Sequence, residues 1–118
     1  MVSSIAGVTG IGSSVAYAAS KGALNTMTLS LARVLGPKIR VNALCPGPVN
    51  TPLLQEQFAK DPERAARRLV HVPMGRFAEP DEIAALATFM LGPEAGFVQG
   101  SIFYIDGGSD AEMRPDRF

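Results

Sequence analysis

The chain has 118 residues with no net charge, and 47% of them are hydrophobic against 19% charged, a composition typical of one globular domain. Its single cysteine, Cys45, excludes an intrachain disulfide and a multi-cysteine metal site, favours a reducing compartment and is expected to pack in the core. No apolar run approaches the roughly 18 residues needed to span a bilayer, and the charge balance gives no field that attracts nucleic acid. We therefore expect a soluble, cytoplasmic protein with no metal site, no nucleic-acid partner and no membrane partner.

The charges are unevenly placed along the chain. No Asp or Glu precedes Glu56, whereas four basic residues do: Lys21, Arg33, Lys38 and Arg40. An acid-free first half suits a site for an anionic ligand such as a phosphate-bearing cofactor. The absence of acidic residues is equally expected if this half of the chain consists mostly of buried strand and helix interior. Both interpretations stay open.

The first third of the chain predicts the end of a strand over residues 1–5, a Gly- and Ser-rich loop over 6–14, and a long helix over 15–35. Gly36-Pro37 ends that helix. Apolar residues at spacings of three and four give the helix one stripe. The stripe consists of Leu24, Met27, Leu31 and Leu35.

The middle of the chain predicts a short strand over 39–44 and a rigid, extended loop over 45–52, which contains three prolines. A helix can start near Leu53, and Asp61-Pro62-Glu63 is a good entry to another.

The last third predicts a helix that opens at Pro80 with acids in its first turn and stops at Gly92. A strand over 101–105, a turn at 106–108 and a loose polar tail over 109–118 follow. Strands that alternate with helices in this way predict parallel strands joined by right-handed crossovers, an α/β layer.

Tyr17 and Lys21 lie four residues apart on the long helix, hence on one face. An ammonium beside a phenol stabilises the phenolate, which helps the tyrosine to exchange a proton. The spacing alone occurs by chance in many helices and does not by itself indicate catalysis. His71, the only histidine, is expected at the surface.

Four ordered blocks around this pair resemble the short-chain dehydrogenase/reductase family. Ser4 lies thirteen residues before Tyr17, as the family's catalytic serine does. Together the matching blocks run from Val2 to about Gly108, and they are 3–24, 40–52, 73–84 and 106–108.

The resemblance implies the C-terminal part of a doubly wound, Rossmann-like parallel sheet, with about three strands and flanking helices. Residues 1–108 would be the catalytic half of such a domain and 109–118 a tail. Family members form homodimers and homotetramers, so we expect contacts through helix 15–35 and strand 101–105.

The resemblance also implies a hydride transfer between NAD or NADP and a small carbonyl or alcohol substrate. Tyr17 would be the general acid/base, Lys21 would assist it and bind the nicotinamide ribose, and Ser4 would hold the substrate oxygen. From the residues alone, Ser4 could instead cap or terminate a strand.

Further residues would meet the nicotinamide end of the cofactor. Pro46 and Gly47 would shape the wall beside the ring, while the Val49 backbone and the Thr51 hydroxyl would meet its carboxamide. Thr51 could equally be a turn residue before a proline. Segment 53–72 matches the family's variable substrate loop, with an apolar lining.

The family's pyrophosphate-binding strand, Gly-rich turn and helix have no counterpart in the sequence. Residues 7–12 superficially look like a phosphate loop, but no acid lies some twenty residues further on, so we interpret them as the connection between Ser4 and Tyr17. Two function classes follow. The chain is an oxidoreductase, or the catalytic half of one, or it is a truncated, cofactor-free remnant that acts as an association or non-redox binding module.

Overall fold

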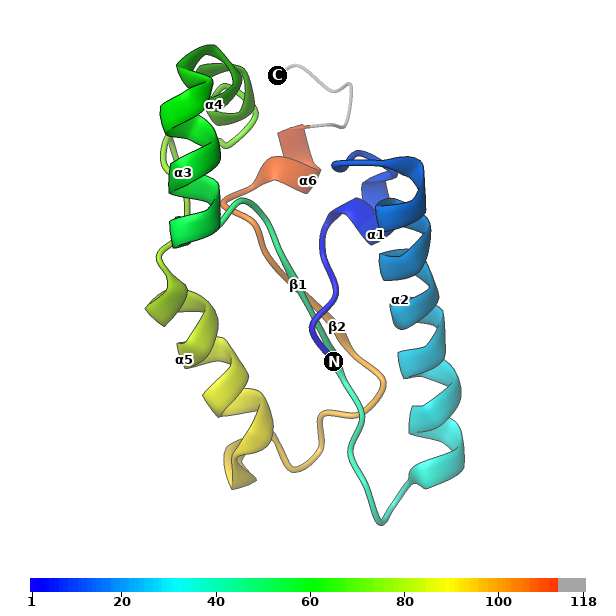
Figure 1. The fold of residues 1–118 in the computed structure, drawn as a ribbon. Helices are drawn as coiled ribbons and strands as arrows, with labels where there is room; N and C mark the ends of the chain where they lie inside the picture. Colours follow the sequence, from blue (N-terminus) through cyan, green and yellow to red (C-terminus); the bar gives the residue numbers. More distant parts are fainter. Residues whose placement is uncertain (113–118) are drawn as a thin grey trace.

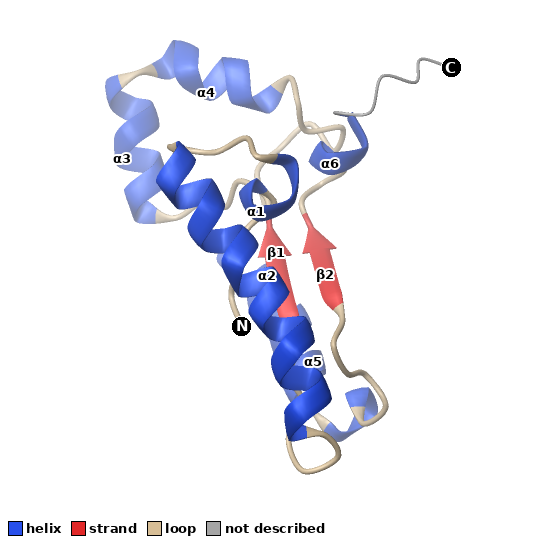
Figure 2. Ribbon diagram, turned by 90° about the vertical axis from the view of Figure 1, so that its right-hand side faces the viewer, coloured by secondary structure: helices blue, strands red, loops and turns tan. Residues whose placement is uncertain are grey.

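A computed structural model describes residues 1–112 and shows a small parallel sheet with helices on both of its faces (Figures 1 and 2). Within these residues no helix is both long and apolar enough to cross a membrane. The elements in chain order are α1 (Ala6–Thr9), α2 (Val15–Leu35), β1 (Ala43–Pro46), α3 (Pro52–Lys60), α4 (Pro62–Leu69), α5 (Pro80–Leu91), the 3₁₀ turn η1 (Pro93–Ala95), β2 (Ile102–Ile105) and α6 (Ser109–Glu112).

β1 is the central strand of the sheet. It pairs in parallel with β2, in a register that runs from Ala43 opposite Ile102 to Pro46 opposite Ile105. On its other side Val2 forms an isolated parallel bridge with Leu44. Helix α2 covers one face of the sheet and α5 the other (Figure 2). The first three residues of β1 are therefore buried, and the α/β class predicted from the sequence is confirmed.

Helix α2 has the predicted bounds, but the face that it buries is not the predicted apolar stripe. Its buried residues are Asn25, Thr28 and Ala32, whereas Met27 is 44% exposed. Short side chains let the helix backbone lie close to β1, and the Thr28 hydroxyl is satisfied by donating to the Leu24 carbonyl at 2.8 Å. The larger apolar residues consequently lie on the flanks of the helix.

The other helix starts follow the capping signals in the sequence. Asp61 accepts a hydrogen bond from the Arg64 N–H at the start of α4, and Pro62 and Pro80 occupy the first positions of α4 and α5. Glu79 and Glu82 form a capping box on α5. Such signals are local, which is why these boundaries are correct.

The predicted strands are only partly correct. Residues 1–5 contribute the Val2 bridge instead of a strand, and the strand expected over 39–44 is β1 at Ala43–Pro46. Before β1 the Val41 N–H donates to the Gln99 Oε1 at 2.6 Å. A side chain thus takes the place of a neighbouring strand, and the ladder begins later than propensity suggests.

Two segments predicted to be irregular contain short helices. Residues 6–9 of the predicted loop form α1, which Gly10 ends in a left-handed conformation at φ 73°. The expected loose tail begins with α6, because the Asp106 carboxylate accepts hydrogen bonds from the N–H groups of Gly108 and Asp110. Residues 113–118 of that tail lie outside the described residues.

Asn42 joins the starts of the two strands. It is 8% exposed; its Nδ2 donates to the Val98 carbonyl at 2.9 Å and its Oδ1 accepts from the Ser101 N–H at 2.9 Å. These bonds hold the segment before β2 beside the segment before β1, so they help to set the register of the sheet.

We expect Asn42→Ala to lower the free energy of unfolding by about 1–3 kcal/mol, because it leaves the Val98 carbonyl and the Ser101 N–H without their partner. Urea denaturation measures this change. Asn50→Ala is the matched control: its amide reaches the exposed Glu79, and we expect a change within about 0.5 kcal/mol. Equal effects of the two variants would contradict the role given to Asn42.

Candidate active site

The carboxyl ends of β1 and β2 are surrounded by α1, the start of α2, the loop after β1 and α6 (Figure 1). Ligands of open parallel α/β sheets bind outside the carboxyl ends of the strands. The candidate residues Ser4, Tyr17 and Lys21 come from the segments that reach this end.

Tyr17 and Lys21 lie on the first turns of α2 and face each other. The Ser14 hydroxyl accepts a hydrogen bond from the Tyr17 N–H at 3.1 Å and starts the helix there. The Lys21 Nζ lies 5.6 Å from the centroid of the Tyr17 ring, within the range of a cation–π contact. The Tyr17 side chain is 38% exposed, and Lys21 Nζ also donates to the Val2 carbonyl at 3.1 Å.

The backbone of Lys21 is fixed by the segment that carries Ser4. The buried Ser3 hydroxyl donates to the Lys21 carbonyl at 2.9 Å. A Cβ on Gly7 would lie 2.5 Å from the Lys21 carbonyl carbon and 2.7 Å from the Gly22 nitrogen, so only glycine allows this approach of α1 to α2. The chain on both sides of Ser4 is thereby held against α2.

Gly12 is also used for packing. A Cβ there would lie 2.9 Å from the Ala6 Cβ and 3.2 Å from the Tyr17 Cδ1. Gly7 and Gly12 therefore seat α1 and the Tyr17 ring, which agrees with the interpretation of residues 7–12 as a connection. Gly10, where a Cβ would meet nothing within 4 Å, ends α1 in a left-handed conformation.

Ser4 is half-buried, and its hydroxyl oxygen accepts a hydrogen bond from the Ala6 N–H at 3.1 Å. This local bond leaves the hydroxyl proton unused. The next residue, Ile5, donates its N–H to the Pro46 carbonyl at 3.1 Å. Ser4 is in this way tied to the loop that follows β1.

That loop is held at both ends. The Gly47 N–H donates to the Ile105 carbonyl at 3.0 Å, and a Cβ on Gly47 would lie 2.8 Å from the Asp106 Cα. Val49 forms a parallel bridge with Ala78. The Thr51 hydroxyl accepts from the Leu54 N–H at 3.3 Å and caps α3, so the turn role weighed for Thr51 is present too.

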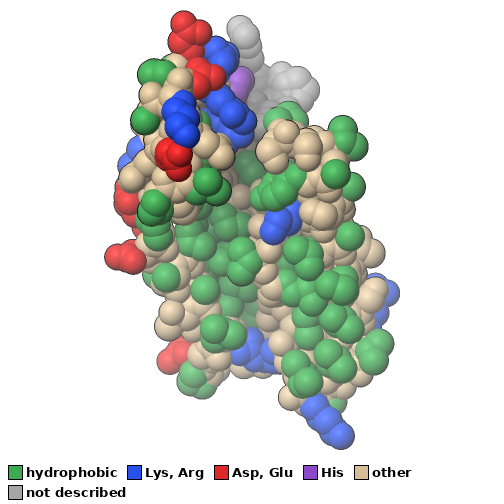
Figure 3. Space-filling model, viewed as in Figure 1, with side chains coloured by type: hydrophobic (Ala, Val, Ile, Leu, Met, Phe, Trp, Pro, Cys, Tyr) green, Lys and Arg blue, Asp and Glu red, His purple; other side chains and the backbone are tan. Residues whose placement is uncertain are grey.

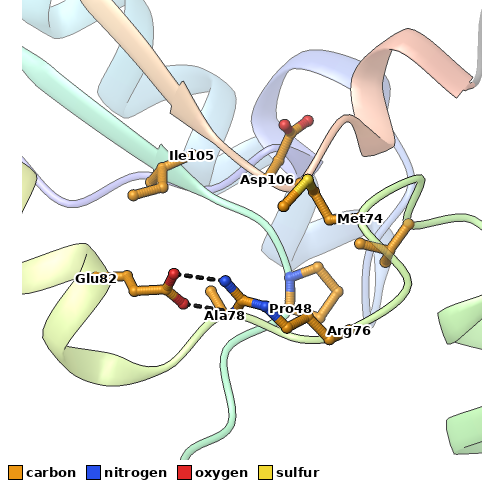
Figure 4. Close-up of a pocket in the computed structure, with 9 residues that line it drawn as sticks. Pro48, Met74, Arg76, Ala78, Glu82, Ile105 and Asp106 are labelled. Atoms are coloured by element: carbon orange, nitrogen blue, oxygen red, sulfur yellow. Dashed lines mark hydrogen bonds and ion pairs between the residues drawn. The ribbon is translucent and has the colours of Figure 1, made fainter.

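A cavity of about 170 Å³ opens on the other side of this loop. Figure 4 shows the Arg76 guanidinium in direct contact with the Glu82 carboxylate in its lining, with two hydrogen bonds of 2.7 Å. None of Ser4, Tyr17 and Lys21 lines this cavity. Its lining residues are Pro48, Val72, Met74, Arg76, Ala78, Glu82, Ile105, Asp106 and Gly107.

Sequence reasoning used 73–84 only as a block of resemblance and missed the pairing of Arg76 with Glu82. The signal for it in the sequence was Arg76, a basic residue that lies six positions before Glu82 in the acidic first turn of a predicted helix.

Cys45 lies below the site, on the buried side of β1. Burial raises the pKa of its thiol, and its Sγ lies 3.5 Å from the Asn25 Oδ1. A buried thiol with a raised pKa is a poor nucleophile, which supports the packing role predicted for Cys45. His71 is exposed, as predicted.

Both the sequence and the fold of the chain are similar to those of known proteins. The family model described as enoyl-(acyl carrier protein) reductase matches residues 1–110. The chain belongs to the short-chain dehydrogenase/reductase family. It is 45% identical over 112 residues to the inactive 2-(S)-hydroxypropyl-CoM dehydrogenase 2 of Xanthobacter autotrophicus, a match that covers 92% of this chain and 49% of that protein.

A second relative is the 3-alpha-hydroxysteroid dehydrogenase/carbonyl reductase of Comamonas testosteroni, which is 42% identical over 91% of this chain and 42% of its own length. Among solved structures, 4-hydroxyisoleucine dehydrogenase complexed with NADH is 31% identical, with a TM-score of 0.84 over 93% of this chain and 45% of that one. The chain spans about half the length of the curated relatives that it matches.

We expect the ion pair beside the cavity to make stability depend on pH. Two hydrogen bonds from Arg76 and one from the Glu79 N–H hold the pKa of Glu82 at about 2, below its ordinary 4.5. A depressed folded-state pKa stabilises the fold above the unfolded value, and this contribution is lost as pH falls from 4.5 towards 2. Urea denaturation at a series of pH values should show a shallower decline for Glu82→Gln across that window.

Glu63→Gln is the control, because Glu63 pairs with Arg67 on an exposed helix face. Identical pH profiles for the wild type and Glu82→Gln would contradict the assignment. High salt should reduce the difference between them, since both partners reach solvent.

Proposed function

We propose that residues 1–108 form the catalytic half of an NAD(P)-dependent oxidoreductase that interconverts a small carbonyl compound and an alcohol. The observation that carries this proposal is the placement of Lys21 Nζ 5.6 Å from the Tyr17 ring at the carboxyl end of the sheet. Family membership over residues 1–110 favours it over an association or non-redox binding module.

In this proposal Tyr17 is the general acid/base. Its phenol passes a proton to the substrate oxygen during reduction and takes it back during oxidation. The Lys21 ammonium lies beside the Tyr17 ring and brings a positive charge to this part of the site. The Ser4 hydroxyl, whose proton is not used in the bond to Ala6, donates to the substrate oxygen and orients it.

The same segments would hold the nicotinamide end of the cofactor. Lys21 would bind the ribose, the Val49 backbone and the Thr51 hydroxyl would meet the carboxamide, and Pro46 and Gly47 would form the wall beside the ring. The bound nicotinamide would supply or accept the hydride. Gly7 and Gly12 are occupied by packing, so these two glycines would not hold the cofactor's pyrophosphate.

Segment 53–72 is the proposed determinant of the substrate. Leu53 is 67% exposed on α3 and is free to line a substrate site. Phe58 instead packs on Phe77, with ring centroids 5.1 Å apart, and Arg68 lies 5.9 Å above its ring. Of the apolar residues in this segment, Phe58 therefore holds α3 in place, and Leu53 is the better candidate for direct contact.

A chimera tests the proposed function. This chain replaces the matched 42% of the Comamonas carbonyl reductase, and oxidation of NADH and NADPH is followed with a panel of ketones. We expect turnover that Tyr17→Phe lowers by about 10²-fold or more with little change in cofactor affinity. Lys21→Ala should impair both the rate and the affinity, since it serves both roles.

Tyr104→Phe is the matched control, because Tyr104 is the only other tyrosine and lies on β2. A Tyr17→Phe chimera that keeps most of its rate would refute the assignment of the general acid/base.

We also propose that the chain forms a homodimer or homotetramer through α2 and β2. Exposed apolar side chains on both elements support this: Met27, Leu29 and Val34 on α2, and Tyr104 on β2. Burial of such residues favours association.

Light scattering coupled to size exclusion at micromolar concentration should show a species at least twice the mass of one chain. Met27 and Val34 lie seven residues apart on one side of α2, so the double variant Met27→Lys, Val34→Lys should shift the chain to monomer. Val70→Lys, an exposed change after α4, is the control and should have no effect. A monodisperse wild-type monomer would show this proposal to be wrong.

A further inference from the structure

The loop after β1 is paired with the segment that precedes α5. The Ala78 N–H donates to the Pro48 carbonyl at 3.1 Å, and the Asn50 N–H donates to the Ala78 carbonyl at 2.7 Å. In a parallel bridge the residue between two such bonds turns its own N–H and C=O the other way. That residue is Val49, so its N–H points away from Ala78 and meets no acceptor within residues 1–112.

Side-chain packing does little to hold these two segments together. Pro48 and Ala78 both line the cavity of about 170 Å³ beside the loop, so open space lies against each of them. Figure 4 shows both residues at this cavity, together with Arg76. The position of Val49 consequently depends on hydrogen bonds and on the groups that fix residues 76–79.

Arg76 and Glu82 fix that segment. The Arg76 Nη1 donates to the Phe77 carbonyl at 3.1 Å and to Glu82 Oε2 at 2.7 Å, and its Nη2 donates to Glu82 Oε1 at 2.7 Å. Glu82 Oε2 also accepts from the Glu79 N–H at 2.8 Å. The residues on both sides of Ala78 are thus tied, directly or through Arg76, to one carboxylate on the first turn of α5.

This ion pair differs from the other exposed pairs on the same side of the molecule. Figure 3 shows charged side chains of both signs over α3, α4 and α5. Among residues 1–112 the other ion pairs lie within one helix or between a helix and its N-cap: Lys60 with Glu56, and Arg67 with Asp61 and Glu63. Arg76 and Glu82 instead join a loop to a helix through a fork, in which two guanidinium nitrogens donate to two carboxylate oxygens. An exposed ion pair adds only modestly to global stability, whereas a fork of this kind fixes a geometry.

We propose that Arg76 is a positioning residue for the cofactor. Its fork on Glu82 holds residues 77–79 against residues 48–50, and this pairing keeps the outward Val49 N–H in place to donate to the carboxamide oxygen of a nicotinamide. The use of Val49 by the cofactor rests on the proposed function, whereas the hold of Arg76 on the loop does not. Without the fork the loop has to be ordered as the cofactor binds, so the apparent affinity falls in proportion to the fraction of chains that have the loop in place.

The first test measures backbone hydrogen exchange by NMR on this chain without cofactor. In Arg76→Gln we expect the Asn50 and Ala78 amides to exchange at nearly the rate of unprotected amides, because the two segments separate. The Gly47 amide is the internal reference. It belongs to the same loop but donates to the Ile105 carbonyl on β2, so its exchange should not change.

Two further variants define what Arg76 supplies. Arg67→Gln removes an exposed arginine–carboxylate pair within α4 and is the matched control, which should leave all three amides unchanged. Arg76→Lys keeps the positive charge but lacks the planar fork that reaches both carboxylate oxygens and the Phe77 carbonyl. We therefore expect the Asn50 amide to stay unprotected in Arg76→Lys, and full protection there would contradict a role for the fork.

The second test uses the chimera with the Comamonas relative and separates cofactor binding from turnover. We expect Arg76→Gln to raise the dissociation constant of NADH or NADPH about tenfold, which corresponds to a loop that is in place in about a tenth of the chains. At saturating cofactor, kcat should stay within about threefold of the wild type, since the cofactor then selects the ordered loop. Tyr17→Phe should show the opposite pattern, with a low kcat and little change in affinity.

Three results would overturn the proposal. These are Asn50 and Ala78 amides that stay protected in Arg76→Gln, an equal acceleration of exchange at Gly47, and an unchanged cofactor affinity in a variant whose loop amides are unprotected. The second result would show that the ion pair stabilises the whole fold and not the loop. A chimera that binds no cofactor would contradict the proposed function and the cofactor role of Val49, while the exchange rates still decide whether Arg76 holds the loop.

Discussion

The contact between Gly7 and the Lys21–Gly22 peptide is the constraint on which the site depends. No side-chain atom fits between these backbones, so α1 can lie on α2 only with glycine at that position. The Ser3 hydroxyl adds a directional bond to the same Lys21 carbonyl. A short turn and a long helix are thereby fixed in one geometry, and Ser4, which lies between Ser3 and Gly7, is held in one place relative to α2.

The burial of β1 explains why α2 turns short residues towards the sheet instead of its predicted apolar stripe. A strand paired on both sides leaves room for a helix only at close range, and Asn25, Thr28 and Ala32 permit that approach. The Thr28 hydroxyl donates to the Leu24 carbonyl, and the Asn25 Oδ1 accepts from the Cys45 thiol on β1. Met27 and other large apolar residues of α2 are consequently exposed on its flanks.

The sequence predicted the helix boundaries, which depend on nearby residues in the chain. It missed the limits of the strands and the contacts of the site residues, which depend on segments that are distant in the sequence. Ser14, Asp61 and Pro80 begin their helices as their residue types require, and α2 has its predicted bounds. The limits of β1 depend on Gln99, more than fifty residues away. The site residues could be named by resemblance, but their present contacts could not. Thr51 caps α3, and Lys21 donates a hydrogen bond to the Val2 carbonyl; both contacts depend on the folded arrangement.

Lys21 connects the start of the chain to the chemistry proposed for Tyr17. Its ammonium donates to the Val2 carbonyl at 3.1 Å and lies 5.6 Å from the centroid of the Tyr17 ring. A hydrogen bond from an ammonium to a backbone carbonyl contributes about 1.5–3 kcal/mol after exchange with water. Because the side chain is held at its end, as its backbone is held by Ser3 and Gly7, the cation stays beside Tyr17 at the carboxyl end of the sheet.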